Sequence, residues 1–209
     1  MINLRKEYLK SHLDESGAHK NPFSQFQTWF AEVIQSDILF PDSMTLATVT
    51  PNGMPNARIV LLKAIDENGL SFFTNHNSPK GHELDNTPHA CCVFWWKEFE
   101  RQVRISGSVE RLSSQASDAY FNTRPRGARL SAWASSQSEV ISNRGVLEQK
   151  MLQIEAQFKN QDVPRPENWG GYLLVPHTFE FWQGRENRLH DRLRYRKVGN
   201  DWILERLAP

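Results

Sequence analysis

Three side chains with cationic or acid–base chemistry alternate near the end of the chain. Arg188, His190 and Arg192 belong to the run WQGRENRLHDR. In an extended chain, residues two apart point to the same side, so these three would share one face. Neighbouring positive charges repel one another unless an anion lies between them. The spacing therefore predicts an anionic ligand, while a basic stripe for nucleic acid, continuing through Arg194 and Arg196, is the competing interpretation.

A second pair of cations flanks an apolar run. Arg58 and Lys63 enclose Ile-Val-Leu-Leu in the sequence RIVLLK, inside an Ile-, Val- and Leu-rich segment, residues 56–65, that predicts one strand. Residues five apart in a regular strand face opposite sides, so the two cations could serve two different anions. The alternative is a pair of solvated charges at the strand ends.

Two further clusters suit phosphate. The run TNHNSPKG carries Thr74, Ser78 and Lys80 at a strand-to-helix junction, where free backbone N–H groups favour an anion. Tyr120 and Arg124 are four apart at a predicted helix end and share a face, so a phenol and a guanidinium could grip one phosphate. A plain capped turn and a solvated surface pair are the respective alternatives.

The composition and the net charge argue against several classes of protein. The 209 residues carry 25 basic and 24 acidic side chains, a net charge of +1 that disfavours a nucleic-acid binder. No apolar run is long enough for a membrane span, and residues 1–20 show no secretory signal. The adjacent Cys91 and Cys92 predict neither a disulfide nor a metal site. We therefore expect a cytoplasmic protein with small anionic ligands, no bound metal, no nucleic acid and no membrane.

The elements that must position these clusters are mostly strands. Asn21-Pro22 predicts a helix start, and Pro125 predicts a helix end that leaves residue 128 in the following turn. Further helices are expected at 79–85, at 114–122 and around 147–158. Strands are expected at 44–50, 56–65, 70–74, 89–97, 101–112, 171–183, 192–198 and 202–206. Seven or eight strands with short turns favour an antiparallel barrel. We expect a flexible segment at residues 1–20 and a single domain at 21–209.

The motifs together resemble one family, the pyridoxine (pyridoxamine) 5′-phosphate oxidases. The resemblance runs from about Arg5 to the C-terminal ERLAP. It is densest in RIVLLK at 58–63, RQVRISGSVERLS at 101–113, YFNTRPRGA at 120–128, QS at 137–138 and WQGRENRLHDR at 182–192. It implies a mainly β protein with peripheral helices, the FMN-binding split β-barrel. It also implies a homodimer that holds each flavin at the subunit interface.

Motif matching implies a role for each site residue. The FMN site is assigned to Arg58, Lys63, Phe73, Thr74, Ser78, Lys80, Gln102, Gln137, Ser138, Trp182 and Arg192. The substrate site is assigned to Lys63, Tyr120, Arg124, Ala128, Arg188 and His190, and the last two are the expected catalytic residues beside the reacting carbon. Three positions depart from the family pattern: Pro79 replaces a common Arg, Ala128 a common Ser, and Phe73 a common Tyr.

The resemblance implies a reaction. Pyridoxine 5′-phosphate or pyridoxamine 5′-phosphate would be oxidised to pyridoxal 5′-phosphate by hydride transfer from C4′ to N5 of FMN. O2 would reoxidise the flavin and yield H2O2, and the amine substrate would also release ammonia after hydrolysis. Two alternatives stay open at this point: a non-catalytic carrier of pyridoxal phosphate, and another split-barrel flavoprotein such as a flavin reductase or a deazaflavin-dependent enzyme.

Overall fold

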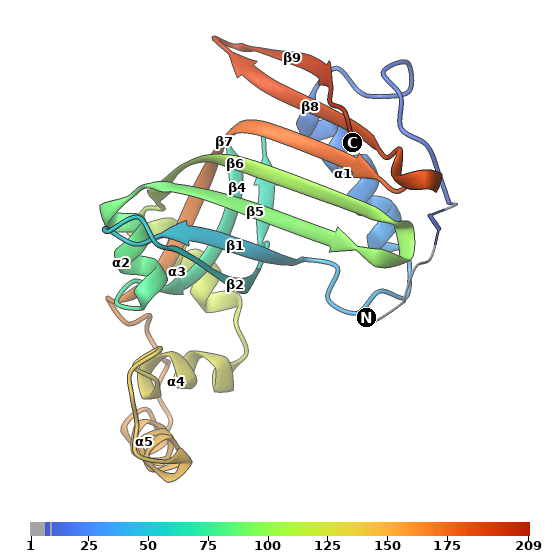
Figure 1. Cartoon of the computed structure of the whole chain (residues 1–209). Helices are drawn as coiled ribbons and strands as arrows, with labels where there is room; N and C mark the ends of the chain where they lie inside the picture. The colour runs from blue at the N-terminus through green and yellow to red at the C-terminus, as the bar shows by residue number, and fades with distance from the viewer. Residues whose placement is uncertain (1–6, 9) are drawn as a thin grey trace.

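The computed structural model describes residues 7–8 and 10–209, and within them nine strands form one antiparallel sheet that curls into a half-barrel (Figure 1). The strands are β1 Ser43–Val49, β2 Pro55–Leu61, β3 Ala64–Asp66, β4 Gly69–Asn75, β5 His89–Trp96, β6 Arg101–Arg111, β7 Trp169–Gln183, β8 Asp191–Val198 and β9 Asp201–Arg206. Their order is β2-β1-β5-β6-β7-β4-β3, and β8 and β9 continue from β7. The helices are α1 Pro22–Ile34, α2 Pro79–Asn86, α3 Ser114–Thr123, α4 Arg126–Ala134 and α5 Arg144–Gln157. The predicted mainly β fold with peripheral helices is confirmed.

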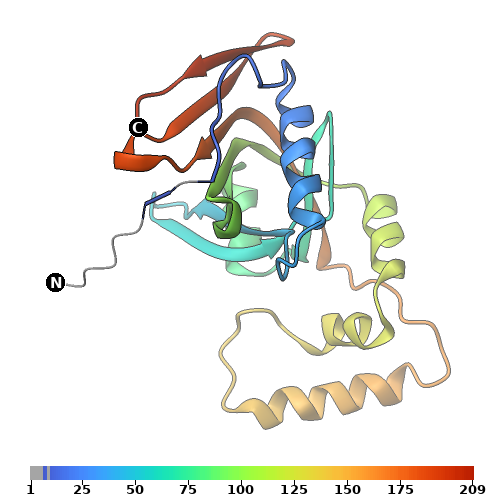
Figure 2. The same cartoon turned by 90° about the vertical axis from the view of Figure 1, so that its right-hand side faces the viewer.

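Helix α1 covers the concave side of the sheet (Figure 2). It begins where the sequence predicts, because the Asn21 side chain accepts a hydrogen bond from the Phe23 N–H and Pro22 occupies the first helical turn. Its apolar stripe is buried, and the Phe26 ring packs edge-on against Phe94 with centroids 5.1 Å apart. The inward side chains of β6 alternate as predicted, and Val103 is among those fully buried.

The single strand expected at 56–65 is wrong. The structure has β2 and β3 with a corner at Leu62 and Lys63 between them. The Leu62 N–H donates to the Asp42 carbonyl beside β1, whereas the Lys63 N–H donates to the Ser71 carbonyl in β4. The chain thus changes its hydrogen-bonding partner within one residue and links the two edges of the sheet. The alternation argument for Arg58 and Lys63 does not hold across such a corner.

Pro125 starts a helix as well as ending one. Arg124 ends α3 in an extended conformation, as expected, but Pro125 is the N-cap residue of α4. A proline is tolerated at a helix start because its missing N–H would have no intrahelical partner there. Ala128 therefore lies in the first turn of α4, and the turn expected at residue 128 is wrong.

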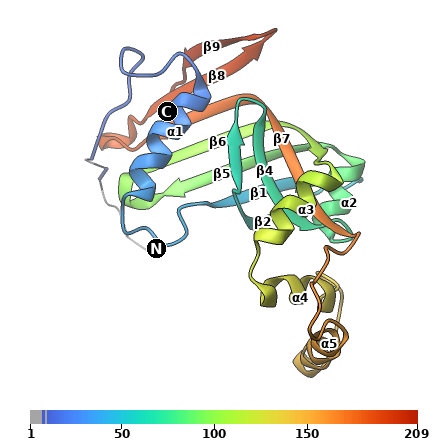
Figure 3. The same cartoon turned by 180° about the vertical axis from the view of Figure 1, so that it is seen from behind.

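Helices α4 and α5 form an arm that projects from the sheet beyond α3 (Figure 3). A separate small core of Leu130, Phe158 and Val163 holds the two helices together, with Met151 and Ile154 packed against it. The helix expected around 147–158 is confirmed as α5, but no residue of the helix itself is fully buried. The long segment between the two helices carries Gln137 and Ser138.

The chain before α1 has no helix or strand among its described residues, and residues 1–6 and 9 lie outside them. The Leu13 side chain is nevertheless buried, and its N–H donates to Asp191 Oδ2 at 3.0 Å. Arg206 donates to both carboxylate oxygens of Glu15. These contacts anchor residues 13–15 to the C-terminal strands.

Phe26→Ala tests the packing of α1 on the sheet. The side chain is fully buried, so truncation should lower the free energy of unfolding by about 3–5 kcal/mol through lost burial and a residual cavity. Urea unfolding followed by circular dichroism measures this change. Leu39→Ala is the control, because Leu39 is 79% exposed; an equal loss in both variants would contradict the assignment of Phe26 to the core.

Candidate functional site

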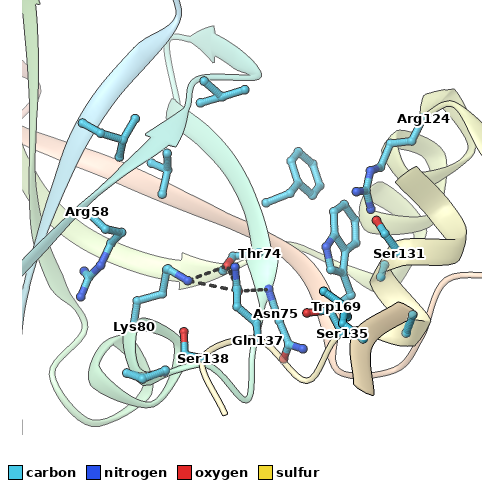
Figure 4. A pocket seen from close by; sticks show the side chains of 18 of the residues that line it. Arg58, Thr74, Asn75, Lys80, Arg124, Ser131, Ser135, Gln137, Ser138 and Trp169 are labelled. Carbon is cyan, nitrogen blue, oxygen red and sulfur yellow. Dashed lines mark hydrogen bonds between the residues drawn. The ribbon is translucent and has the colours of Figure 1, made fainter. Parts of the chain in front are cut away.

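A cavity of about 1200 Å³ lies between the strands β2 and β4, helix α3 and the arm (Figure 4). Nine of the residues that the sequence assigns to the FMN and substrate sites line it: Arg58, Lys63, Phe73, Thr74, Lys80, Tyr120, Arg124, Gln137 and Ser138. Ser78 is fully buried just behind this wall. One cavity therefore collects side chains from four segments that are distant in sequence.

Lys80 is a buried cation among neutral groups. Its ammonium nitrogen lies 3.1 Å from Thr74 Oγ1, 3.2 Å from Ser78 Oγ and 3.1 Å from Gln137 Oε1. Burial, with the nearby charge of Arg58, lowers the pKa of Lys80 to about 8. Ser78 also caps the start of α2, whose free N–H groups add positive potential. This corner of the cavity is suited to an anion.

A second cationic corner lies across the cavity. The Arg124 guanidinium lies 4.6 Å from the centre of the Trp169 ring, and Tyr120 stacks on Phe73 at 3.9 Å. Burial lowers the pKa of Arg124, and its Nη1 is buried with no hydrogen-bond partner among the described residues. A buried donor without a partner needs an acceptor from a ligand or water. Lys63 also lines the cavity and is paired with Asp42 at 2.9 Å.

The remaining assigned residues lie outside this cavity. Gln102 faces Trp182 across β6 and β7, and Trp182 faces Arg192 across β7 and β8. The His190 ring lies 4.6 Å from the Trp182 ring. Arg188 ends a short 3-10 turn, Glu186–Arg188, and has a φ of 61°. The extended alternation expected for residues 188–192 is therefore wrong at its first position.

His190 is held as a neutral base. Its Nδ1 accepts a hydrogen bond from the Arg185 N–H at 3.1 Å, which assigns the proton to Nε2. Burial lowers the pKa of His190, and the charge of Arg188 lowers it further. The ring therefore offers an Nε2–H donor near neutral pH. Arg192 is engaged by the Glu180 carboxylate at 2.8 Å.

The two groups of residues lie toward opposite ends of β7. Thr74 pairs with Gly170 at one end, and Gln102 pairs with Trp182 at the other. Twelve residues of one strand separate these pairs, or about 40 Å along the strand at 3.3 Å per residue. A single protomer does not bring the two groups together.

Two positions at which the sequence departs from the family pattern, Pro79 and Ala128, differ in their relation to the cavity. Pro79 lines the cavity beside Lys80. Ala128 does not line it and is half-buried in the first turn of α4. Sequence reasoning also missed two residues. Glu83 contacts Arg58, and its position three residues after Lys80 on α2 was the available signal. Trp169 packs under Arg124, and no local pattern indicated it.

Among the described residues, no cluster of three or more His, Cys, Asp or Glu side chains is placed to hold a metal ion. Nor does the described part of the chain contain a helix long and apolar enough to span a membrane.

Comparison with known proteins gives consistent matches. The family model described as "Pyridoxamine 5′-phosphate oxidase" matches residues 30–158, and that described as "Pyridoxine 5′-phosphate oxidase C-terminal dimerisation region" matches residues 169–209. A pyridoxine/pyridoxamine 5′-phosphate oxidase of a Cyanothece species is 55% identical over 99% of this chain and 97% of its own. The Salinibacter ruber relative of the same name is 50% identical over 100% and 99%.

Solved structures share the fold. PhzG from Burkholderia lata, in complex with tetrahydrophenazine-1-carboxylic acid, superimposes with a TM-score of 0.88 at 32% identity, covering 94% of this chain and 98% of that one. A pyridoxamine 5′-phosphate oxidase-related, FMN-binding protein from Nostoc punctiforme superimposes with a TM-score of 0.72 at 20% identity, covering 90% and 98%. These structural matches confirm the split-barrel architecture.

The lowered pKa of Lys80 predicts pH-dependent anion binding. Below pH 8 the ammonium is charged and attracts an anion, whereas above pH 8 the empty site has lost that proton. The affinity for sulfate, which stays a dianion, should therefore fall by up to about tenfold per pH unit above pH 8. Calorimetric titration between pH 6.5 and 9.5 measures this, and Lys80→Met should bind weakly at every pH. Equal sulfate affinity of the wild-type protein at pH 7 and 9.5 would contradict the assignment.

Proposed function

The chain belongs to the pyridoxamine 5′-phosphate oxidase family, and on that premise we propose that it oxidises pyridoxine 5′-phosphate or pyridoxamine 5′-phosphate to pyridoxal 5′-phosphate. FMN is its cofactor, and when bound it supplies the oxidation by accepting the hydride from C4′ at N5 and passing the electrons to O2 as H2O2. The observation that carries the proposal is the pair of separate cationic corners in one cavity. A phosphorylated cofactor and a phosphorylated substrate need one corner each.

The corner around Lys80 suits the cofactor phosphate. Arg58 and Lys80 supply positive charge, Thr74 and Ser78 supply hydroxyls, and the start of α2 supplies backbone N–H groups. Gln137 and Ser138 border the same space. The donor set fits a phosphate monoester, since every direct hydrogen-bond acceptor of Lys80 among the described residues is uncharged.

The corner around Arg124 suits the substrate phosphate. Arg124 has a buried donor to offer, Tyr120 adds a phenol, and Lys63 adds a second cation. A phosphate oxygen would satisfy Arg124 Nη1 and compensate the burial of its charge. Ala128 contributes no side-chain donor here, so the substrate contact expected at this position is not part of the proposal.

We assign the other half of the site to the partner subunit. Arg188 and His190 are proposed to hold the substrate at its reacting carbon, with Gln102, Trp182 and Arg192 against the flavin. These residues are too far along β7 from Thr74 to serve the same protomer's cavity. The match of residues 169–209 to a dimerisation region supports a homodimer, and we propose that the flavin lies at its interface.

The roles of the protein groups are then binding and orientation. The neutral His190 donates from Nε2 to the substrate, and Arg188 adds positive charge beside it. Orientation of reactants in this way contributes about 7–11 kcal/mol in favourable cases. A carrier of pyridoxal phosphate would need only one phosphate corner, so the second corner favours the oxidase. The two free cysteines suit a reducing cytoplasm, which is the proposed compartment.

Aerobic turnover with added FMN tests the proposed function. Both phosphorylated substrates should yield aldehyde and H2O2 in equal amounts. Unphosphorylated pyridoxine should have kcat/KM lower by about a hundredfold or more, because charged hydrogen bonds to phosphate are worth about 1.5–3 kcal/mol each. Arg124→Ala should erase most of that preference. Absence of peroxide with either phosphorylated substrate would refute the oxidase, and equal kcat/KM with pyridoxine would refute the phosphate corner.

Subunit complementation tests the shared site. One variant carries Arg58→Ala and Lys80→Met, and the other carries Arg188→Ala and His190→Ala, so each homodimer should be nearly inactive. Random mixed dimers contain one fully intact site, so refolding an equal mixture should restore about a quarter of wild-type activity. Mixing Arg58→Ala with Lys80→Met, which damage the same half, is the control and should restore none. Failure of the first mixture to recover would argue for sites built within one chain.

A further inference from the structure

A buried carboxylate lies behind Arg58 at the corner proposed for the cofactor phosphate. Glu83 is on α2, one turn after Lys80, and its side chain is only 4% exposed. A buried negative charge beside an anion site is unfavourable by Coulomb's law alone. Its presence therefore calls for a compensating role.

The carboxylate is fully engaged and charged. Its Oε2 accepts hydrogen bonds from Thr48 Oγ1 and from Arg58 Nη2, the latter at 3.0 Å, and its Oε1 accepts one from Asn56 Nδ2 at 2.9 Å. Burial alone would raise the pKa of Glu83, but these hydrogen bonds outweigh it and lower the pKa. Glu83 is thus an acceptor fixed on three sides.

These contacts hold one edge of the Arg58 guanidinium. Arg58 Nη1 donates to Thr48 Oγ1 and to the Leu46 carbonyl, and Nη2 donates to Glu83. Thr48 and Glu83 are themselves hydrogen-bonded, so they form one clamp across the terminal edge. The other edge, Nε with the second hydrogen of Nη2, has no partner among the described residues. That edge is the fork that grips a phosphate with two parallel hydrogen bonds.

We propose that Glu83 is a positioning residue: with Thr48 it clamps the terminal edge of Arg58, so that the Nε edge is presented to the FMN phosphate. The inference rests on the proposed function and deepens it. An arginine side chain without the clamp would sample many rotamers and lose them on binding, which weakens affinity. Positioning and simple electrostatics predict opposite signs for removal of Glu83. Loss of the clamp weakens FMN binding, whereas loss of a nearby negative charge alone would tighten it.

Flavin titrations of the apo-protein separate these effects. Quenching of flavin fluorescence gives the Kd for FMN and for riboflavin, which lacks the phosphate. Glu83→Ala should raise the Kd for FMN by about tenfold or more and leave the Kd for riboflavin within about twofold. Glu83→Gln keeps an acceptor for Arg58 and should stay within about threefold of wild type. Asp85→Asn is the matched control, because Asp85 lies on the same helix but pairs with Arg111; neither Kd should change.

A double-variant cycle assigns the effect to Arg58. In an Arg58→Ala background, Glu83→Ala should cause no further loss of FMN affinity. The inference is overturned if Glu83→Ala leaves FMN binding unchanged or tighter, weakens both flavins equally, or keeps its full effect without Arg58. If Glu83→Ala does not fold, Thr48→Val removes the other half of the clamp and should give the same selective loss. Wild-type protein that does not bind FMN would overturn the proposed function; tight wild-type binding with an unaffected Glu83→Ala variant overturns the role of Glu83 only.

Discussion

Strand β7 connects the parts of the molecule that matter for chemistry. Over fifteen residues it pairs with β4, β6 and β8. It begins at Trp169, its second residue pairs with Thr74, and near its other end Trp182 pairs with Arg192 and contacts the His190 ring. The residues that pair with Thr74 and with Gln102 lie twelve residues apart on this strand, so changes in the loops do not bring them together. On the proposed assignment, the two halves of the site are complementary surfaces of one protomer, and a second subunit brings them together.

At the end of β7 that borders the cavity, the two cations Lys80 and Arg58 have opposite electrostatic surroundings. Around Lys80 the protein buries a cation among neutral oxygens; the burial, with the nearby charge of Arg58, lowers its pKa to about 8 and leaves its charge to be met by a ligand. Around Arg58 it does the opposite and supplies a carboxylate, which fixes the direction of the guanidinium. Lys80 therefore contributes uncompensated charge and Arg58 contributes geometry. Arg124 resembles Lys80, since its burial is compensated by Trp169 rather than by an acid.

Local sequence patterns predicted the elements whose structure depends on neighbours along the chain. The Asn21-Pro22 start of α1 and the alternating side chains of β6 are examples, because capping and pleat act over a few residues. The corner at Leu62 and Lys63 could not be predicted, since it depends on an exchange of partners between β1 and β4. Helix α4 was missed because Pro125 is compatible with both the end and the start of a helix.

The residues of the candidate site also fall into those that the sequence predicted and those that it could not predict. Motif resemblance named nine of the residues that line the cavity. It could not say that Arg188 and His190 lie away from Lys80 within a protomer, because motifs carry no distances. It also did not find Glu83 or Trp169, which act on ligand-binding side chains through packing and hydrogen bonds. Ala128 shows the converse: a position matched by motif is half-buried on α4 and does not line the cavity. The individual roles of the site residues stay predictions until the variants are measured.

The arm of α4 and α5 has a consequence for how such proteins change over evolutionary time. Without a compensating bulge such as the one at His177, an inserted residue in β7 would turn every later side chain to the other face, so the strand tolerates substitutions more readily than changes of length. The arm has its own small core and meets the cavity through Gln137, Ser138 and the near faces of its helices. Insertions and deletions can accumulate there without shifting the sheet. We therefore expect descendants of this fold to diverge in substrate mainly by remodelling the arm, while the register of the sheet is inherited intact.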